Sequence, residues 1–198
     1  MKRFVLIAVL LVAAAMSATP LRADLLTFDP LNQTVPLGTQ ASVTILFDTP
    51  IVGDFDLVVN WNPSILAFDS YVLGSLLGDP LLGEAIDGFA LAAASLGVFE
   101  ISLLLPAELS ALQGAGPIDF FTITFDTIGV GTSPLTFSAP AGATFIPIGN
   151  EEGIQRDFSA DTGSITVQSR DGQVPEPASL LLLTAGLAAM ATRLRRRA

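Results

Sequence analysis

The most constraining feature of this sequence is a series of short runs in which apolar and polar residues alternate. In the run FDLVVNW, residues 55–61, every second residue from Phe55 to Trp61 is apolar. A period of two is typical of a half-buried β-strand, because successive side chains of a strand point to opposite faces. Glycine, proline, aspartate and asparagine separate the runs, and these residues favour turns. The pattern therefore predicts many short strands joined by tight connections.

The same reading extends over the whole central part of the chain. Only residues 106–113 suggest a helical turn outside the two chain ends. A set of short strands with so little helix predicts an all-β fold in which two sheets pack face to face. The runs that we predict as strands are 25–28, 42–47, 55–61, 67–73, 89–94, 98–104, 120–126, 132–137, 144–148, 156–159 and 164–168.

The N-terminal segment has the three-part plan of a secretory signal peptide. Basic residues at positions 2 and 3 precede an apolar run at 4–15, and small residues follow. Such a run is shorter than the ~20 residues that a membrane-spanning helix needs. We predict that residues 1–23 are a signal peptide, with cleavage after Ser17 or after Ala23. An uncleaved N-terminal anchor is the alternative.

The C-terminal segment combines a short motif, an apolar stretch and a basic end. The triplet Pro175-Glu176-Pro177 precedes the stretch 178–192. At about 1.5 Å per residue a helix of this length reaches ~22 Å, against ~30 Å for the hydrocarbon core of a bilayer. We expect a marginal transmembrane helix, with residues 169–174 as the linker to the fold. The arginines that should stay cytoplasmic are Arg193, Arg195, Arg196 and Arg197.

The charge of the central part excludes several classes of function. Between Asp24 and Glu176 the chain has 19 acidic residues and only two basic ones, Arg156 and Arg170. A body this acidic repels nucleic acid, so we expect no nucleic-acid partner. The chain has no cysteine and no histidine. Thiol catalysis, imidazole bases and the usual ligands of transition metals are therefore excluded.

The last 25 residues resemble the PEP-CTERM sorting signal of Gram-negative bacteria. The resemblance rests on the triplet Pro175-Glu176-Pro177, the short apolar helix and the arginine-rich end, in that order. It implies recognition by an exosortase, a membrane enzyme that cuts near the triplet. It also implies transient anchoring in the inner membrane, transfer to the cell surface or extracellular matrix, and an association with exopolysaccharide and biofilm. An ordinary C-terminal anchor is the alternative.

Residues 24–168 resemble a cohesin-type domain, related to carbohydrate-binding modules. The resemblance rests on 35–38 (VPLG), 61–66 (WNPSIL), 116–118 (GPI) and 161–167 (DTGSITV). Trp61-Asn62 replaces the Tyr-Asp of the cohesin pattern. The resemblance implies a single jelly-roll β-sandwich of about nine strands. These matches are core and turn residues, so they indicate a fold more than a function.

Few side chains in this sequence suggest a binding site, and the first candidates are ligands for a metal ion. The aspartates Asp54 and Asp56, with Asp157 and Asp161, have the oxygen ligands that calcium prefers, although no calcium-loop motif is present. Solvated surface charge is the alternative interpretation. No other cofactor is expected.

The single tryptophan and the single tyrosine are the candidates for stacking on a sugar ring. Trp61 continues the apolar face of its strand, so burial is the favoured interpretation for it. Tyr71 is the second candidate.

Two short motifs resemble parts of hydrolase active sites, but ordinary turn and loop residues are the favoured interpretation of both. Residues 161–164 (DTGS) match an aspartic-protease motif, yet that chemistry requires two such carboxylates, and the motif falls in a predicted turn. Glu151 and Glu152 are adjacent in a glycine-flanked loop, where a glycosidase geometry is not expected. We therefore predict that the protein is not an enzyme.

The function hypothesis is an exported, non-catalytic protein of the cell surface or extracellular matrix. It would act on an extracellular polysaccharide or a surface protein. The alternatives are a carbohydrate-binding module proper and a protein-binding module of the cohesin type.

The sorting hypothesis makes a direct prediction. Replacing Pro175, Glu176 and Pro177 together with alanine should leave the full-length protein in the inner membrane, because the processing enzyme loses its recognition element. Intact mass and membrane fractionation in the native host measure the outcome. The neighbouring variant Gln173→Ala is the control and should be processed. Normal processing of the triple variant would contradict the hypothesis.

Overall fold

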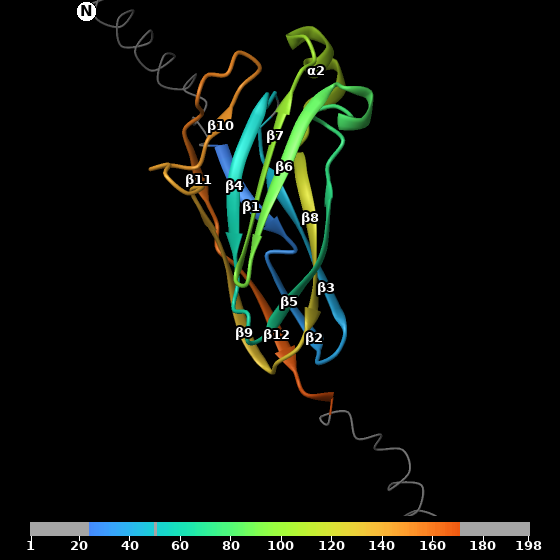
Figure 1. Cartoon of the computed structure of the whole chain (residues 1–198), viewed down its shortest axis with the longest axis vertical. Coiled ribbons are helices and arrows are strands. Elements are labelled where there is room, and N and C mark those ends of the chain that lie inside the picture. Colours follow the sequence, from blue (N-terminus) through green and yellow to red (C-terminus); the bar gives the residue numbers. More distant parts are fainter. Residues whose placement is uncertain (1–23, 50, 171–198) are drawn as a thin grey trace, which may run out of the picture.

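The computed structural model describes residues 24–49 and 51–170, which form a two-sheet sandwich (Figure 1). The predicted signal peptide, most of the predicted linker and the whole predicted sorting signal lie outside these ranges. The strands are β1 Asp24–Asp29, β2 Asn32–Pro36, β3 Gln40–Phe47, β4 Asp54–Asn60, β5 Leu66–Leu73, β6 Ala85–Ala92, β7 Ser95–Ser102, β8 Ile118–Thr127, β9 Gly131–Ser138, β10 Ile148–Gly149, β11 Phe158–Ala160 and β12 Gly163–Gln168. A 3₁₀ turn, η1 (Pro80–Leu82), and one helix, α2 (Pro106–Gln113), complete the elements.

Each sheet is antiparallel except at one end. The first sheet has the strand order β11-β1-β3-β8-β5, and the second has the order β2-β12-β9-β4-β7-β6, with β10 paired to β4. The pairs β1–β11 and β2–β12 are parallel. Short strands near the two chain ends thus extend both sheets with residues that are far apart in sequence, and the ends of the domain are fixed by the sheets themselves.

A β-bulge in β8 allows two consecutive aromatic residues to enter the core. In the ladder with β3, Ile45 is opposite Phe121 and Leu46 is opposite Asp119, so Phe120 has no partner. Both Phe120 and Phe121 are buried. In a regular strand one of the two would face solvent, because the side-chain period is two. The bulge therefore places two large rings on the same side of the sheet.

A row of aromatic rings crosses the core between the two sheets. Neighbouring ring centroids along this row are 4.2 to 6.5 Å apart. The closest pair is Phe55 of β4 and Phe120 of β8, which are stacked with their planes 13° apart. The row runs from β11 to β6 through Phe158, Phe47, Phe120, Phe55, Phe121, Tyr71 and Phe89. Aromatic packing of this kind joins strands of both sheets into one core.

Helix α2 is attached to one end of the sandwich by a buried side chain. The Gln113 amide accepts a hydrogen bond from the backbone N–H of Val52 (2.8 Å) and donates to the carbonyls of Val52 (2.7 Å) and Leu76 (3.0 Å). Gln113 is buried, so these three bonds satisfy an amide that would otherwise be costly to bury. The helix thereby holds two loops in place at this end.

The all-β prediction and the two-sheet sandwich are confirmed. The helix predicted at 106–113 is present with the same bounds. Strand β2 was not predicted, because the sequence NQTVP is polar and contains a proline. Its place at the sheet edge, parallel to β12, tolerates that proline. Within residues 24–49 and 51–170, no helix has the length and apolar character required to cross a membrane.

The aromatic row predicts a large penalty for removing a central ring. Phe120→Ala should lower the free energy of unfolding by about 3–5 kcal/mol, because the cavity falls where Phe47 and Phe55 pack on the same ring. Chemical denaturation of the purified protein measures this value. The control Val130→Ala removes methyl groups from an exposed side chain and should change it by less than ~0.5 kcal/mol. Equal changes in the free energy of unfolding for the two variants would contradict the stabilising role of the aromatic row.

Candidate functional site

The outer faces of the two sheets differ in chemistry. The outer face of the first sheet has a ladder of polar pairs between β3 and β8. Ser42 and Thr124 are hydrogen-bonded at 3.0 Å, and Thr44 and Thr122 at 2.8 Å. These hydroxyl groups bind one another and face solvent. This face is typical of the solvated side of an antiparallel sheet.

The outer face of the second sheet is apolar over much of β7 and β6 and at Val58 of β4, whereas the other outward residues of β4 are polar. In the ladders of these strands Val58 is opposite Gly97, which is opposite Ala90, and Ile101 is opposite Ile86. Ile86 and Ile101 are 52% and 45% exposed. Phe99 is two residues before Ile101 on β7 and lies opposite Gly88 of β6. We call the outward side chains of this region the outer patch, which consists of Val58, Ile86, Ala90, Phe99 and Ile101.

The Phe99 ring lies over a glycine on the neighbouring strand. A Cβ atom built on Gly88 would come within 2.4 Å of Cε1 of Phe99. Only glycine allows the ring to lie this close to β6 at the cross-strand position. The ring therefore covers the backbone of β6 and presents an apolar surface to solvent.

Part of the outer patch forms one side of a shallow groove. Val58, Ala90 and Phe99 line this groove of about 380 Å³ together with Pro140 and Ala141, which follow β9. Asp56 lies at the border of this groove, next to Phe99 on the adjacent strand. Burial raises the pKa of the Asp56 carboxyl and that of Asp54 above their usual values. The two carboxylates therefore form an acidic border beside an apolar floor.

A buried carboxyl group lies beneath the outer patch. Glu100 follows Phe99 on β7 and points to the opposite face, into the core, where it is fully buried. Neither of its carboxylate oxygens has a hydrogen-bond partner. Burial, and then the charge of Asp87 on β6, together raise the pKa of Glu100 to about 7. Near neutral pH, part of the population therefore holds Glu100 as a neutral acid.

The structure separates the two predicted stacking residues. Trp61 is 5% exposed and packs edge-on against Phe125, with ring centroids 5.1 Å apart. It is thus a core residue, as its alternation pattern favoured. Tyr71 is half-buried at the edge of the sandwich, 5.2 Å from the ring of Phe89. Burial, and then the charge of Asp87, raise the pKa of the Tyr71 hydroxyl.

The four aspartates considered for calcium occupy two regions. Asp54 and Asp56 share the outward face of β4, whereas Asp157 and Asp161 flank β11. Asp161 accepts a hydrogen bond from the hydroxyl of Thr27 at 3.3 Å. Among residues 24–49 and 51–170, no group of three or more acidic, histidine or cysteine side chains is arranged to hold a metal ion. The calcium hypothesis gains no support from this arrangement.

The sequence analysis missed the outer patch. Its residues are small or alternate with buried positions, so they read as ordinary strand residues. One signal was available: the predicted strand 89–94 begins with four apolar residues in a row, which a solvated edge does not require. The sorting residues Pro175, Glu176, Pro177, Arg193, Arg195, Arg196 and Arg197 lie outside the described residues.

Glu100 gives a testable pH dependence. The pKa of Glu100 is raised in the folded state, from 4.5 to about 7, so the folded protein binds more protons than the unfolded chain in this range. Wild-type stability should therefore fall as the pH rises from ~4.5 through ~7, by on the order of 2 kcal/mol from this group. Glu100→Gln should lack that part of the decrease and be more stable than wild type at pH 8. Chemical denaturation across this range measures both proteins, and parallel pH profiles would contradict the assignment.

Comparison with known proteins identifies the C-terminal segment. Residues 173–197 match the model of the PEP-CTERM protein-sorting motif. The match covers the triplet, the apolar stretch and the arginines predicted as a sorting signal. It implies an exported protein that an exosortase sorts toward the cell surface or extracellular space. No curated protein matches the chain.

Solved structures similar to the body are cohesin domains. One is the cohesin CaCohA2 from Clostridium acetobutylicum, at 16% identity and a TM-score of 0.59, covering 78% of this chain and 94% of that one. A chain of a type I cohesin–dockerin complex from Clostridium thermocellum has 12% identity and a TM-score of 0.59, covering 74% and 100%. A non-cellulosomal cohesin from Archaeoglobus fulgidus has 13% identity and a TM-score of 0.54, covering 79% and 97%. The chain thus combines a body of cohesin fold with a C-terminal PEP-CTERM sorting motif.

Proposed function

We propose that this protein is a non-catalytic binding module of the cell surface or extracellular matrix, and that it binds a protein partner through the outer patch. In this proposal residues 1–23 direct export and are removed, and residues 169–174 link the body to the sorting motif. An exosortase processes the chain near Pro175-Glu176-Pro177. The mature body then acts among exopolysaccharide and biofilm components.

The observation that carries the binding role is the contrast between the outer patch and the outer face of the other sheet, where the hydroxyl groups of β3 and β8 are paired. The described residues contain 17 acidic side chains and two arginines, yet β6 and β7 present isoleucine, phenylalanine and alanine to solvent. Contiguous apolar surface with a polar border is typical of an interaction site. The opposite face of the sandwich, with its paired hydroxyl groups, has no such property.

The border of the outer patch indicates the chemistry of the partner. Asp54 and Asp56 lie on β4 beside Ile101 and Phe99. A partner that buries this region must neutralise the two carboxylates, because an unpaired buried charge is costly. We therefore expect an apolar ridge flanked by lysine or arginine. The long-range field of the acidic body would also attract a basic surface.

The similarity to cohesins agrees with a protein partner. Solved relatives of the body include cohesins in complex with dockerins. At 12 to 16% identity the likeness shows only the fold, so a dockerin-like partner is part of the proposal. The non-catalytic role is supported by the composition of the chain, which has neither histidine nor cysteine.

Site-specific photocrosslinking in the native host tests the proposed face. A photoreactive phenylalanine analogue at Ile101 should give a discrete protein adduct, because this residue is on the middle strand of the outer patch, two residues from Phe99, and is 45% exposed. The matched control places the same analogue at Val72, an exposed residue on the outer face of β5 in the other sheet. That position should give no such adduct. Mass spectrometry identifies the crosslinked protein.

A second substitution distinguishes specific binding from random collision. Adding Phe99→Ala to the Ile101 crosslinking variant should reduce the adduct about tenfold, because it removes the largest apolar contact of the outer patch. An adduct of equal yield at Val72, or one insensitive to the Phe99 substitution, would contradict the proposed face. The sorting prediction stands apart from this result, since it depends only on the tail.

A further inference from the structure

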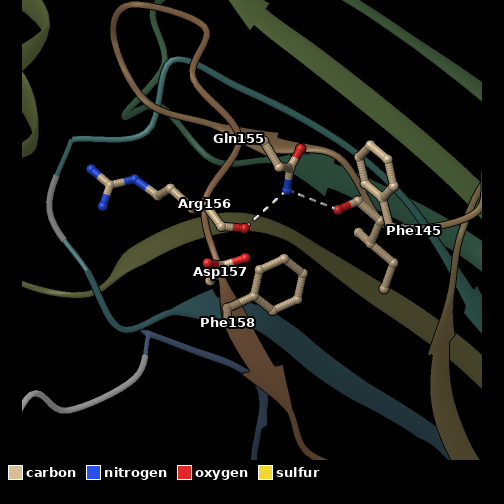
Figure 2. Close-up of a pocket in the computed structure, with 6 residues that line it drawn as sticks. Phe145, Gln155, Arg156, Asp157 and Phe158 are labelled. Atoms are coloured by element: carbon tan, nitrogen blue, oxygen red, sulfur yellow. Dashed lines mark hydrogen bonds between the residues drawn. The ribbon is translucent and has the colours of Figure 1, made fainter.

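A second surface feature lies at the β10–β11 end of the sandwich. Two chain segments, one just before β10 and one leading into β11, enclose an open cleft of about 410 Å³ (Figure 2). Its lining residues are Phe145, Ile146, Gln155, Arg156, Asp157 and Phe158. None of them belongs to the outer patch. The cleft is large enough for a small ligand or for a segment of a polymer.

The walls of the cleft are held together by hydrogen bonds. The Gln155 amide nitrogen donates to the carbonyl of Ile146 at 3.3 Å and to that of Arg156 at 3.0 Å. The backbone N–H of Arg156 donates to the carbonyl of Ile148 at 2.8 Å. These bonds join the two segments directly. A ligand would therefore meet a cleft that is already formed, which lowers the entropic cost of binding.

The arginine side chain is held on the other side of its segment. The Arg156 guanidinium forms an ion pair with Asp24 at 3.3 Å and donates to the carbonyl of Ile51 at 2.8 Å. In Figure 2 it points away from the rings of Phe145 and Phe158. Its contacts fix the segment 155–157 against β1 and the loop after β3. The Arg156 side chain thus positions the wall of the cleft, and the other lining residues provide the groups that a ligand would contact.

Two phenyl rings supply the apolar part of the cleft. Phe145 is 57% exposed, although a solvated loop does not require an aromatic residue there. Phe158 is half-buried and packs edge-on against Phe47 in the core, at 5.6 Å between centroids. One ring is therefore fixed by the core, and the other lies on the loop at the opposite wall. Ring faces of this kind pack well against the C–H faces of a sugar.

The polar groups of the cleft are hydrogen-bond acceptors. Both N–H donors of the Gln155 amide are directed to backbone carbonyls, which leaves its oxygen as an acceptor. Asp157 is exposed and adds two carboxylate oxygens. A suitable ligand must therefore provide several donors close to an apolar face. Sugars satisfy this requirement because each ring has several hydroxyl groups, whereas a peptide backbone offers donors and acceptors in equal numbers.

We propose that the cleft between Phe145 and Phe158 is a subsite for an uncharged hexopyranose unit of a polysaccharide. One phenyl ring packs against the sugar, while Asp157 and the Gln155 oxygen accept hydrogen bonds from its hydroxyl groups. The acidic body repels anionic polysaccharides, so the ligand is neutral. This subsite depends neither on the outer patch nor on a protein partner.

The position of the cleft suits a protein that is tethered through its C-terminal end. The described chain ends at Arg170, just after β12, at the lower end of the sandwich in Figure 1. Strands β10 and β11 lie in the upper half of the same view. A body held by its tail would thus present the cleft away from the point of attachment.

Affinity electrophoresis of the full-length chain in mild detergent tests the subsite. Gels containing a soluble neutral polysaccharide, either hydroxyethyl cellulose, laminarin or galactomannan, should retard the wild-type protein. Gels containing alginate should not. Phe145→Ala should weaken the retardation constant for the best neutral polysaccharide about tenfold, because it removes an exposed packing ring. Asp157→Asn should also weaken it.

Two further variants separate binding from folding. Phe145→Trp enlarges the ring and should strengthen retardation, an outcome that damage to the fold does not produce. Val130→Ala changes an exposed apolar residue outside the cleft and should migrate like wild type. No retardation by any of the three neutral polysaccharides, retardation by alginate alone, or equal retardation of Phe145→Ala and wild type would overturn the proposal. Failure here leaves the photocrosslinking result at the outer patch unaffected.

Discussion

The structure depends on the aromatic row that joins its two sheets. Stacked pairs connect Phe120 of β8 with Phe47 of β3 in the same sheet and with Phe55 of β4 in the other sheet. Each pair adds about 0.5–1.5 kcal/mol beyond the burial of its surface. The row exists only because the bulge in β8 turns both Phe120 and Phe121 inward. The domain has no disulfide cross-link between its sheets, so ring packing contributes much of the stability of the sheet–sheet contact.

The two ends of the row reach the two surface features that we assign to binding. Phe158 forms one wall of the cleft beside β11, while Phe89 belongs to β6, the edge strand of the outer patch. At each end a ring that faces solvent on one side is supported by the core on the other. Binding surfaces built on such supported residues are rigid before a ligand arrives, and this reduces the entropic cost of binding.

The negative charge of the body restricts which ligands the outer patch and the cleft can bind. The excess of carboxylates around the body disfavours anionic ligands and attracts basic surfaces. Beneath the outer patch, Glu100 has no hydrogen-bond partner for its carboxylate, and its raised pKa reflects that burial. The strand β7 thus carries an apolar residue, Phe99, toward solvent and an acid toward the core. Apolar residues usually face the core and acidic residues usually face solvent. Burying the Glu100 carboxyl lowers the stability of the fold, and a structural role alone does not explain that cost.

The sequence by itself determined most of the strands, the helix at 106–113, the acidic character and the sorting motif, since each follows from local pattern or composition. It also indicated the burial of Trp61, because that residue continues the alternation of its strand. Only the tertiary structure decided where the two surface features lie to which we assign binding. The pairing of β6 with β7 places Phe99 over Gly88, and the loop before β10 brings Phe145 near Phe158. These contacts join residues through sheet register, bulges and loop closure, which no local pattern encodes.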